Sequence, residues 1–456
     1  MNENFILISN GYGEVLKIVN TGATLFEEDA RATPMPVKEN YRGFVPWGVD
    51  NLRPQKILKL VRKDEVMNQN QLFNTLCCYA GGIKVIDEKT GLPIKRDSST
   101  VWNFFRHNRL APFFLEQVSD IEYFFFSVAV IILNREGTRI VQLLHKEACF
   151  CRFETANPDT GRIEHIFYAN WEEHPRNDAV EAIPLLNIVD PLGDLEQRMG
   201  IATNDEGEYK TTTDRKFAIL TRIPTGGNKY YPSVPFWAVF RSGWYDIKQM
   251  IPTGKKANFK NGLAVRWMVE IYGEYRKKIF ETEKISDPVK QDARWKKEME
   301  TIRDFMMGIE NEGKVWVTGF YVDPTGKEQS MVRISQVGGD RKGGEWISDS
   351  EEASNMICYA QGIHPSLIGA TPGKTKGSFS GSDKRELFTM KQSLNLPIHD
   401  QMRELFFVIQ EFNKNSDARW GEIAFDIPLI MLSTLDKGSD AVKTNYIPIP
   451  PDDDTE

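Results

Sequence analysis

The stretch EWISDSEEASNMICYAQGIHPSLIGATPGKTKGSFSGSDKREL, residues 345–387, contains a helix, a His-Pro stop, a long loop and the start of a second helix. In the first helix Ser348 and Asp349 are N-cap candidates, because their side-chain oxygens can accept hydrogen bonds from the first backbone N–H groups. Gly362 and Pro365 are expected to end this helix, since neither residue favours its continuation. The stretch therefore predicts two helices joined by a long connection.

That connection, residues 364–384, is longer than most loops in compact domains. Loops of more than about a dozen residues without secondary structure are usually functional or disordered. The part that reads ATPGKTKGSFSGS contains Lys374 and Lys376 among glycines and serines, and Phe379 is its only large apolar residue. We expect a mobile, cationic loop here.

The second helix is expected to begin near Asp383, which can form a capping box with Glu386. Its apolar residues step by three or four along one face: Leu387, Met390, Leu394, Ile398, Met402, Leu405, Ile409 and Phe412. Pro397 interrupts the pattern. Because a proline inside a helix removes one backbone hydrogen bond and clashes with the preceding turn, we expect a kink there.

The order of these features resembles the portal proteins of tailed bacteriophages, in which a second stem helix, a tunnel loop and a long helix follow one another. Upstream, YPSVPFW at 231–237, SGW at 242–244 and KKANFKN at 255–261 look like a first stem helix that runs into a clip. WGVDN at 47–51 and YAGGI at 79–83 look like the start of a portal wing. The resemblance covers residues 41–425 and rests on the order of the motifs.

The resemblance implies an α+β, portal-like fold with an α/β wing and two stem helices that flank an inserted α/β clip. The expected divisions are an N-terminal arm 1–40, wing 41–232, stem helix 233–258, clip 259–340, stem helix 341–363, tunnel loop 364–384, long kinked helix 385–415, and C-terminal strand with acidic tail 416–456. Little sequence follows the long helix, so the crown of larger portals is expected to be reduced.

The resemblance also implies a function without catalysis. A ring of about twelve chains would stand at one vertex of a phage head, the channel for packaging and ejecting double-stranded DNA. The wing would meet capsid and scaffold proteins, and the clip would dock the terminase large subunit and then neck or adaptor proteins. Such a protein works in the virion after assembly in the host bacterial cytoplasm, and needs neither a cofactor nor a membrane.

The implied site residues fall into three groups. Residues of the tunnel loop that would face DNA are Gly373, Lys374, Thr375, Lys376, Gly377, Ser378, Phe379, Ser380, Lys384 and Arg385. Clip residues that would bind terminase or neck proteins are Lys290, Arg294, Lys297, Asp323, Thr325 and Gly326. Stem packing residues are Phe236, Trp237, Phe240, Trp244, Met356 and Ile363. The aromatics at helical spacing predict packing against a neighbouring helix or subunit, and we expect a monomer to leave the two stem faces partly exposed.

Composition and net charge are also compatible with a portal-like protein. With 456 residues, 41% of them hydrophobic and 27% charged, the chain fits a soluble protein of two or more packed units. Neither a membrane span nor an N-terminal signal pattern is evident. A net charge of −7 is wrong for a protein that grips DNA phosphates through clustered cations, but suits a channel through which DNA slides.

The five cysteines have apolar or aromatic neighbours and no C-x-x-C spacing, so we expect buried, reduced thiols and no metal site. Cys149 and Cys151 lie in a strand-like stretch, which would place both thiols on one face. They belong to a predicted β-meander over residues 123–171, whose first strand, from Tyr123 to Leu133, is apolar enough to be buried. Its turns are expected at 134–137 and 157–161.

Between the predicted stem helices the pattern changes to that of a small α/β unit. Residues 263–271 alternate in polarity and predict a strand, and Asp287-Pro288 opens a helix. Residues 314–322 and 328–337 predict a hairpin around a turn at 323–326.

Two alternatives remain. Gly369-Ala370-Thr371-Pro372-Gly373-Lys374-Thr375 resembles a phosphate-binding loop and would suit a nucleotide-binding enzyme, but it has three residues between the glycines where that motif needs four. The other alternative is a different ring-forming head-tail connector.

The carboxylates Asp349, Glu351 and Glu352 lie at the start of a predicted helix, where compensation of the helix dipole explains them without a catalytic role. His364 is expected to end a helix.

Overall fold

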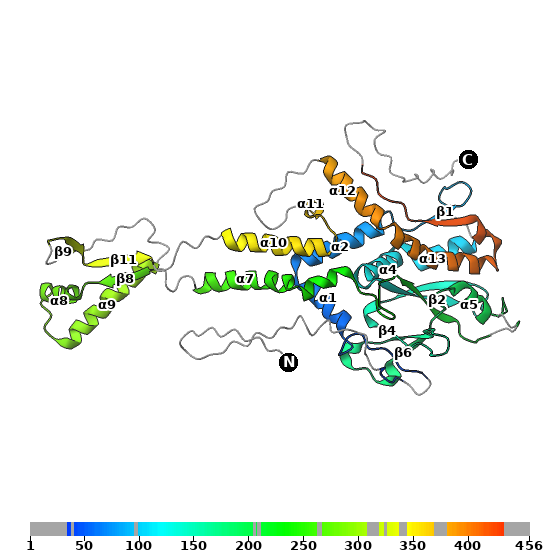
Figure 1. Cartoon of the computed structure of the whole chain (residues 1–456), viewed down its shortest axis with the longest axis horizontal. Helices are drawn as coiled ribbons and strands as arrows, with labels where there is room; N and C mark the ends of the chain where they lie inside the picture. The colour runs from blue at the N-terminus through cyan, green and yellow to red at the C-terminus, as the bar shows by residue number, and fades with distance from the viewer. Residues whose placement is uncertain are drawn as a thin grey trace, which may run out of the picture. The chain divides into compact units, whose positions relative to one another are not determined.

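The computed structural model describes residues 34–37, 41–94, 99–203, 207, 211–261, 267–307, 319–322, 326–336, 344–368 and 381–432. The chain divides into two compact units. The first unit is Met1–Lys248 with Glu351–Glu456, and the second is Gln249–Ser350. Both mix helices with antiparallel strands, so the fold is α+β as predicted (Figure 1).

The helices are α1 Arg53–Lys63, α2 Glu65–Tyr79, α3 Thr100–Asn108, α4 Leu110–Phe124, α5 Pro191–Arg198, α6 Ala238–Arg241, α7 Trp244–Asn261, α8 Gly273–Thr282, α9 Pro288–Met307, α10 Gly344–Ala360, α11 Pro365–Ile368, α12 Gly381–Leu394 and α13 Leu396–Lys414. The strands are β1 Lys84–Asp87, β2 Phe126–Leu133, β3 Ile140–Lys146, β4 Cys151–Phe153, β5 His165–Tyr168, β6 Glu181–Pro184, β7 Lys216–Arg222, β8 Trp267–Ile271, β9 Phe320–Val322, β10 Glu328–Ser330, β11 Val332–Gln336 and β12 Ile423–Asp426.

Strand β2 is the middle strand of the antiparallel sheet β3-β2-β7 at the centre of the first unit. Alternate residues of a strand point to opposite faces of its sheet. Here Phe126 and Val128 enter one buried cluster, whereas Ala129 and Ile131 enter another. The apolar run is therefore explained by burial on both faces. The predicted strand is confirmed from Phe126 onward, but its first expected residues, beginning at Tyr123, belong to the end of α4.

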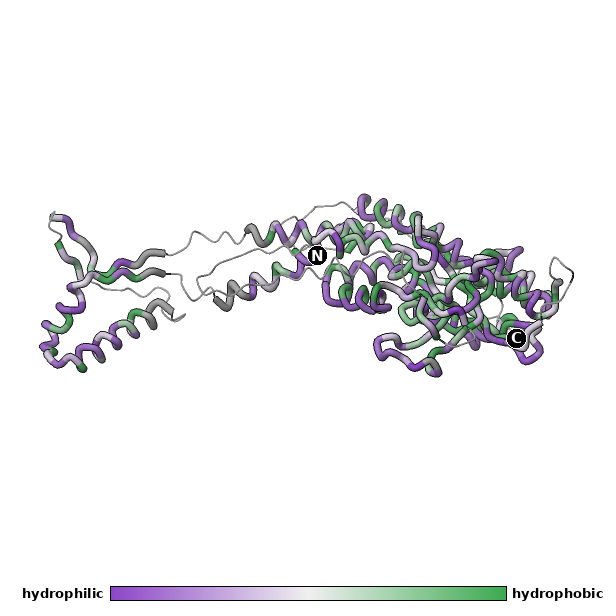
Figure 2. The backbone as a smooth tube through the Cα atoms, turned by 60° about the horizontal axis from the view of Figure 1, so that its bottom comes forward, coloured by the Kyte–Doolittle hydropathy of each residue, from purple (hydrophilic) through white to green (hydrophobic). Residues whose placement is uncertain are grey.

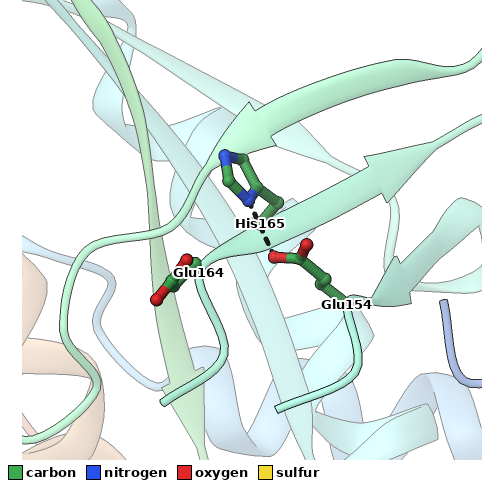
Figure 3. Close-up of side chains that lie close together, drawn as sticks. All are labelled: Glu154, Glu164 and His165. Atoms are coloured by element: carbon green, nitrogen blue, oxygen red, sulfur yellow. Dashed lines mark hydrogen bonds and ion pairs between the residues drawn. The ribbon is translucent and has the colours of Figure 1, made fainter. Parts of the chain in front are cut away.

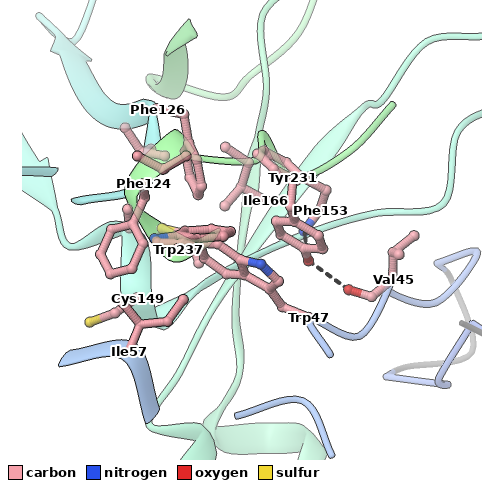
Figure 4. Close-up of a cluster of buried hydrophobic side chains, with 14 of the residues drawn as sticks. Val45, Trp47, Ile57, Phe124, Phe126, Cys149, Phe153, Ile166, Tyr231 and Trp237 are labelled. Atoms are coloured by element: carbon pink, nitrogen blue, oxygen red, sulfur yellow. Dashed lines mark hydrogen bonds between the residues drawn. The ribbon is translucent and has the colours of Figure 1, made fainter. Parts of the chain in front are cut away.

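The first cluster is built around Trp47, whose ring stacks on that of Tyr231 at 4.5 Å between centroids and an angle of 5° (Figure 4). The Tyr231 hydroxyl donates a hydrogen bond of 2.6 Å to the Val45 backbone oxygen. Both rings contribute large apolar areas, and the buried hydroxyl has the partner that it needs. These contacts join two segments that are far apart in sequence.

The second cluster is covered by α13, which buries Leu405, Phe406 and Ile409 against it. The predicted long helix breaks here into α12 and α13 at Asn395, with Pro397 in the first turn of α13. The expected interruption at this proline is confirmed. The helix starts at Gly381, however, so Asp383 lies inside the first turn and is not its N-cap.

The predicted β-meander is wrong in its topology. Strands β2 and β3 pair across the turn at 134–137, as expected, but β4 and β5 pair with β6 in a separate three-stranded sheet. Cys149 lies in a 3-10 helix, Ala148–Phe150, and only Cys151 is in a strand. The prediction that alternation along a strand places both thiols on one face therefore does not apply.

The predicted stem helices also differ from the observed ones in their limits. The first is interrupted at Ser242 and Gly243, where Gly243 has a φ of +86° that favours glycine. In the second, Ser348 and Asp349 lie inside α10, which starts at Gly344, so they are not its N-cap. Its predicted end is confirmed, with Gly362 at a φ of +63°.

The second unit contains α8, α9 and two small antiparallel sheets. β8 pairs with β11, and β9 pairs with β10. The predicted helix that opens at Pro288 is confirmed. The predicted hairpin is confirmed only for β9 and β10, because the rest of its expected second strand, β11, pairs with β8 instead. The hairpin's turn residues 323–325 lie outside the described residues.

Candidate functional site

Helix α7 leads into the second unit, and its first turns are fixed to α1 and α2. Lys248 Nζ lies 2.5 Å from Glu65 Oε1 and 3.9 Å from Asp64 Oδ2. Lys248 is 3% exposed and Asp64 is fully buried. The hydrogen bond from Lys248 lowers the pKa of the Glu65 carboxyl. Tyr245 Oη donates to the Leu60 backbone oxygen at 2.8 Å, so two side chains of α7 hold the helix in place.

Helix α10 leads back from the second unit, and Gln361, one residue beyond its end, fixes it to α2. Its Nε2 donates to the Met67 backbone oxygen and to Gln71 Oε1, both at 3.1 Å. Its Oε1 accepts from Asn70 Nδ2 at 2.9 Å, and its backbone oxygen accepts from Asn74 Nδ2 at 3.0 Å. Because buried amide groups must be hydrogen-bonded, this network gives the end of α10 one position on α2.

The aromatic residues of the predicted first stem helix lie inside the first unit. Phe236, Trp237 and Phe240 are each at most 4% exposed and belong to the cluster around Trp47. Trp244 packs against the same cluster. These side chains therefore pack, as expected, but against the chain's own core, so they do not contribute to an exposed stem face.

Other apolar side chains on these two helices are exposed. Tyr359 on α10 is 80% exposed, Met356 is 36% exposed and Ile247 on α7 is 41% exposed. Ile363, by contrast, is buried. Of the predicted stem packing residues, only Met356 is thus exposed to a large extent. Tyr359 was not singled out from the sequence, although it lies three residues after Met356 and therefore on the same face of the helix.

The predicted cations of the second unit do not form one free charged face. Arg294 Nη1 lies 2.8 Å from Glu298 Oε2, and Arg294 Nη2 lies 2.8 Å from Glu283 Oε1. These hydrogen bonds raise the pKa of the Arg294 guanidinium. Lys290 and Lys297 are exposed on the same helix, α9. Gly326 is exposed with a φ of +83°, whereas Asp323 and Thr325 lie outside the described residues.

Most of the predicted tunnel loop, from Gly373 to Ser380, lies outside the described residues, as does the glycine-rich loop at 369–375. Lys384 is exposed in the first turn of α12, and Arg385 beside it is half-buried.

His364 does not end α10. Its Nδ1 lies 2.6 Å from Ser366 Oγ and accepts from the Ser366 backbone N–H, so it stabilises the start of α11.

Glu154, Glu164 and His165 are the described residues whose side chains lie as close together as metal ligands do (Figure 3). Glu154 Oε2 lies 2.7 Å from His165 Nδ1. Arg42 Nη2 lies 2.9 Å from Glu164 Oε2 and 3.4 Å from Glu154 Oε2. Partial burial opposes ionisation of Glu164, but hydrogen bonds from Arg42 and Asn157 lower its pKa. These side chains form a network in which the Arg42 guanidinium already lies beside both carboxylates.

All five cysteines are buried and unpaired with one another, as the sequence predicted. Burial raises the pKa of the Cys149 thiol to about 12 and raises that of Cys358. Since the thiolate is the reactive form, these thiols have the properties of core residues.

Among the described helices, none combines the length and the apolar composition that a membrane span requires.

No family model matches the sequence, and no curated protein matches it. Solved structures share its fold. A chain in the neck of an empty GTA particle, computed with C6 symmetry, has a TM-score of 0.52 at 11% identity over 82% of this chain and 83% of that chain. A chain in the virion of a native gene transfer agent (GTA) particle has a TM-score of 0.51 at 12% identity over the same shares. A chain in the neck of a native GTA particle, computed with C12 symmetry, has a TM-score of 0.50 at 12% identity over 87% of this chain and 86% of that chain.

Proposed function

We propose that the chain is a structural subunit of a phage-like particle, a portal-like protein that forms a ring between head and tail. The observation that carries this proposal is the fold shared with neck and virion chains over more than four fifths of both chains. The order of sequence features that resembles phage portals supports it. In this role the protein acts in the virion, at the vertex where DNA enters and leaves.

About twelve copies would close into the ring, and double-stranded DNA would pass through it without sequence-specific contacts. The C6 and C12 symmetries of the neighbours' necks support a closed ring of this order. Met356 and Tyr359, which are exposed on one face of α10, would be covered by neighbouring copies, as would the exposed Ile247 on α7, because large apolar side chains exposed together mark interaction sites. The net charge of −7 would keep the duplex from sticking to the channel.

Imaging of the purified protein tests the ring. We expect closed rings with a pore wide enough to pass a DNA duplex, and we expect Tyr359→Glu to shift them toward monomers while the circular dichroism spectrum stays unchanged. Phe407→Glu is a matched control, because Phe407 on α13 is also an exposed aromatic residue. A monodisperse monomer at high concentration, even with scaffold or capsid protein added, would refute the ring.

The second unit would serve as the clip that docks the terminase large subunit and then neck proteins, and the first unit would serve as the wing that meets the capsid. Lys290→Glu with Lys297→Glu should weaken terminase binding, mainly through the association rate and its salt dependence. Arg294 is left unchanged because it is paired within the unit. Binding that survives this reversal but is lost on mutating the first unit would show that the clip is assigned to the wrong segment.

The loop at 364–384 would narrow the channel, with Lys374, Lys376, Lys384 and Arg385 touching phosphates transiently. Deleting residues 373–380 should permit ring assembly but lower the yield of packaged genomes. The protein would have no catalytic activity and no cofactor. The competing hypothesis, a nucleotide-binding enzyme that uses the loop at 369–375, requires specific ATP binding that is lost on Lys374→Ala. Calorimetry with ATP separates the two, because we expect no binding in either form.

A further inference from the structure

A pocket of about 820 Å³ lies in the first unit, where β5 begins, β6 and β7 end, and α5 packs beside them. Four cationic side chains line it, together with two carboxylates. The cations are Arg162, Arg198, Arg222 and Lys229, and the carboxylates are Glu164 and Asp194. Whether this pocket can attract an anion depends on how many of these charges are already paired.

Both carboxylates already have cationic partners. Asp194 Oδ2 lies 2.8 Å from Arg198 Nη2, and Glu164 Oε2 lies 2.9 Å from Arg42 Nη2. Within the part of the chain that the structure describes, Arg162, Arg222 and Lys229 have no carboxylate partner. Three positive charges around one pocket are therefore left without compensation by any described carboxylate.

Arg222 is the most informative of the three, because it is half-buried. Both its Nη atoms donate to backbone oxygens, those of Lys229 and Asn228, which holds it in place. Its Nε is buried and makes no hydrogen bond among the described residues. Burial lowers the pKa of the guanidinium. A cation that is desolvated without an opposite charge destabilises the fold, and a bound anion offsets this cost.

Next to these cations the pocket has an apolar rim. Val189 is 91% exposed and Ile188 is 40% exposed, although both are large aliphatic residues. Their loop is held in place because the Asn187 backbone N–H donates to Asp194 Oδ2 at 2.9 Å. Apolar side chains beside unpaired cations suit a peptide that carries aliphatic residues and carboxylates in sequence, more than they suit a small inorganic anion.

The chain itself contains such a segment. Residues 447–456 read IPIPPDDDTE, in which two isoleucines among prolines precede four acidic residues in the last five positions. Prolines favour an extended backbone and so reduce the conformational entropy lost on binding. The 14 residues between Leu432 and Ile447 can span up to about 50 Å at ~3.5 Å per residue, so the acidic segment can lie far from the last described residue.

We propose that this pocket binds the acidic segment 447–456 of the chain, with the carboxylates at Arg162, Arg222 and Lys229 and the isoleucines on Ile188 and Val189. The proposal does not depend on the ring. The binding covers the exposed aliphatic residues and compensates the buried guanidinium. Such contacts between charged groups weaken as ionic strength rises.

A labelled synthetic peptide of residues 444–456 tests the proposal by fluorescence anisotropy. The receptor is the full-length chain with Asp452→Asn, Asp453→Asn, Asp454→Asn and Glu456→Gln, so that its own segment competes less. We expect saturable binding at low salt. Arg162→Glu with Lys229→Glu should weaken it by about tenfold or more, because both side chains are exposed and can change without unfolding the unit.

Lys89→Glu with Arg106→Glu is the matched control, since it makes the same change in net charge at two exposed residues outside the pocket. We expect this control to change the affinity less than about twofold. The wild-type chain should bind the peptide more weakly than the receptor with the neutral segment. Absence of binding at low salt, an equal loss in the control, or no loss in the pocket variant would each overturn the proposal.

Discussion

The two units of the chain differ in how they are held together. The first contains three buried clusters rich in aromatic residues, and none of these clusters includes a residue of the second unit. Among described residues, the second unit buries few large side chains, such as Phe280 and Ile302, and its backbone is coloured mainly hydrophilic in Figure 2. It also contains ion pairs such as Arg276 with Asp292, but these are exposed and contribute little to stability. Since small cores are only marginally stable, we expect the first unit to be the stable scaffold and the second to open more readily.

The largest expected effect tests the core of the first unit. Trp47→Ala removes a fully buried indole that stacks on Tyr231 and should lower the free energy of unfolding by about 4 kcal/mol. Urea unfolding followed by circular dichroism measures this loss. Val49→Ala, two residues away and 77% exposed, is the control and should change stability little. Equal losses in the two variants would show that this core is not the main source of stability.

The second prediction concerns the point where the first unit holds α7. Lys248→Met removes the cation that lies beside the buried Asp64 carboxylate and should destabilise the first unit by about 3 kcal/mol. Glu65→Gln is the matched control: Glu65 is exposed, so its loss should cost about 0.5 kcal/mol or less. If both variants lose the same stability, the buried Lys248–Asp64 contact contributes nothing of its own.

The third prediction concerns the small core of the second unit. Phe280→Ala should destabilise that unit by about 2 kcal/mol, less than the full value for a core phenylalanine because Phe280 is 9% exposed. Hydrogen exchange should therefore accelerate in residues 267–307 and remain unchanged in β2. Faster exchange in both units would contradict their separation.

The smallest effect is pH-dependent and lies at Asp417 in the first unit. Hydrogen bonds from Arg419 and Thr100 lower its pKa to about 2. A pKa below the usual value of about 3.9 means that this carboxylate stabilises the fold above about pH 4 and loses the effect as the pH falls toward 2. Asp417→Asn should therefore cost about 0.5 kcal/mol at pH 7, a value reduced because the side chain is partly exposed, and much less at pH 2, where the folded-state carboxylate is about half protonated. Urea midpoints at both pH values measure it, and an equal loss at pH 2 would argue against the charge as its cause.

Several features of the fold could be predicted because they depend on a few neighbouring residues. The break between α12 and α13 follows from Pro397, and the turn before β3 follows from Gly137, which has a φ of +77°. Strand β2 could be predicted from its apolar run. The predicted first residues of the helices were less accurate, because serine and aspartate also occur inside helices, as Ser348 and Asp383 do here.

The candidate sites were harder to predict because side-chain burial depends on distant partners. Phe236 and Trp237 have the same spacing whether they face a second subunit or their own core. The sequence predicts that Arg294 is a free cation, but in the structure it forms ion pairs with Glu283 and Glu298. The role of Gln361 in fixing α10 to α2 could not be predicted from the sequence, because its hydrogen-bond partners lie nearly 300 residues away in the chain.

By itself, the sequence determined where many of the helices and strands lie, that the cysteines are buried, and that the chain is long enough for two or more packed units. Each of these depends on residue type, local spacing or composition, which act over a few residues. Only the tertiary structure decided that β4 leaves the sheet of β2, that the stem aromatics are covered by the chain's own core, and that Arg162 and Arg222 meet at one pocket. Such pairings are chosen by the packing of segments far apart in the chain, since buried groups require partners that local sequence does not specify.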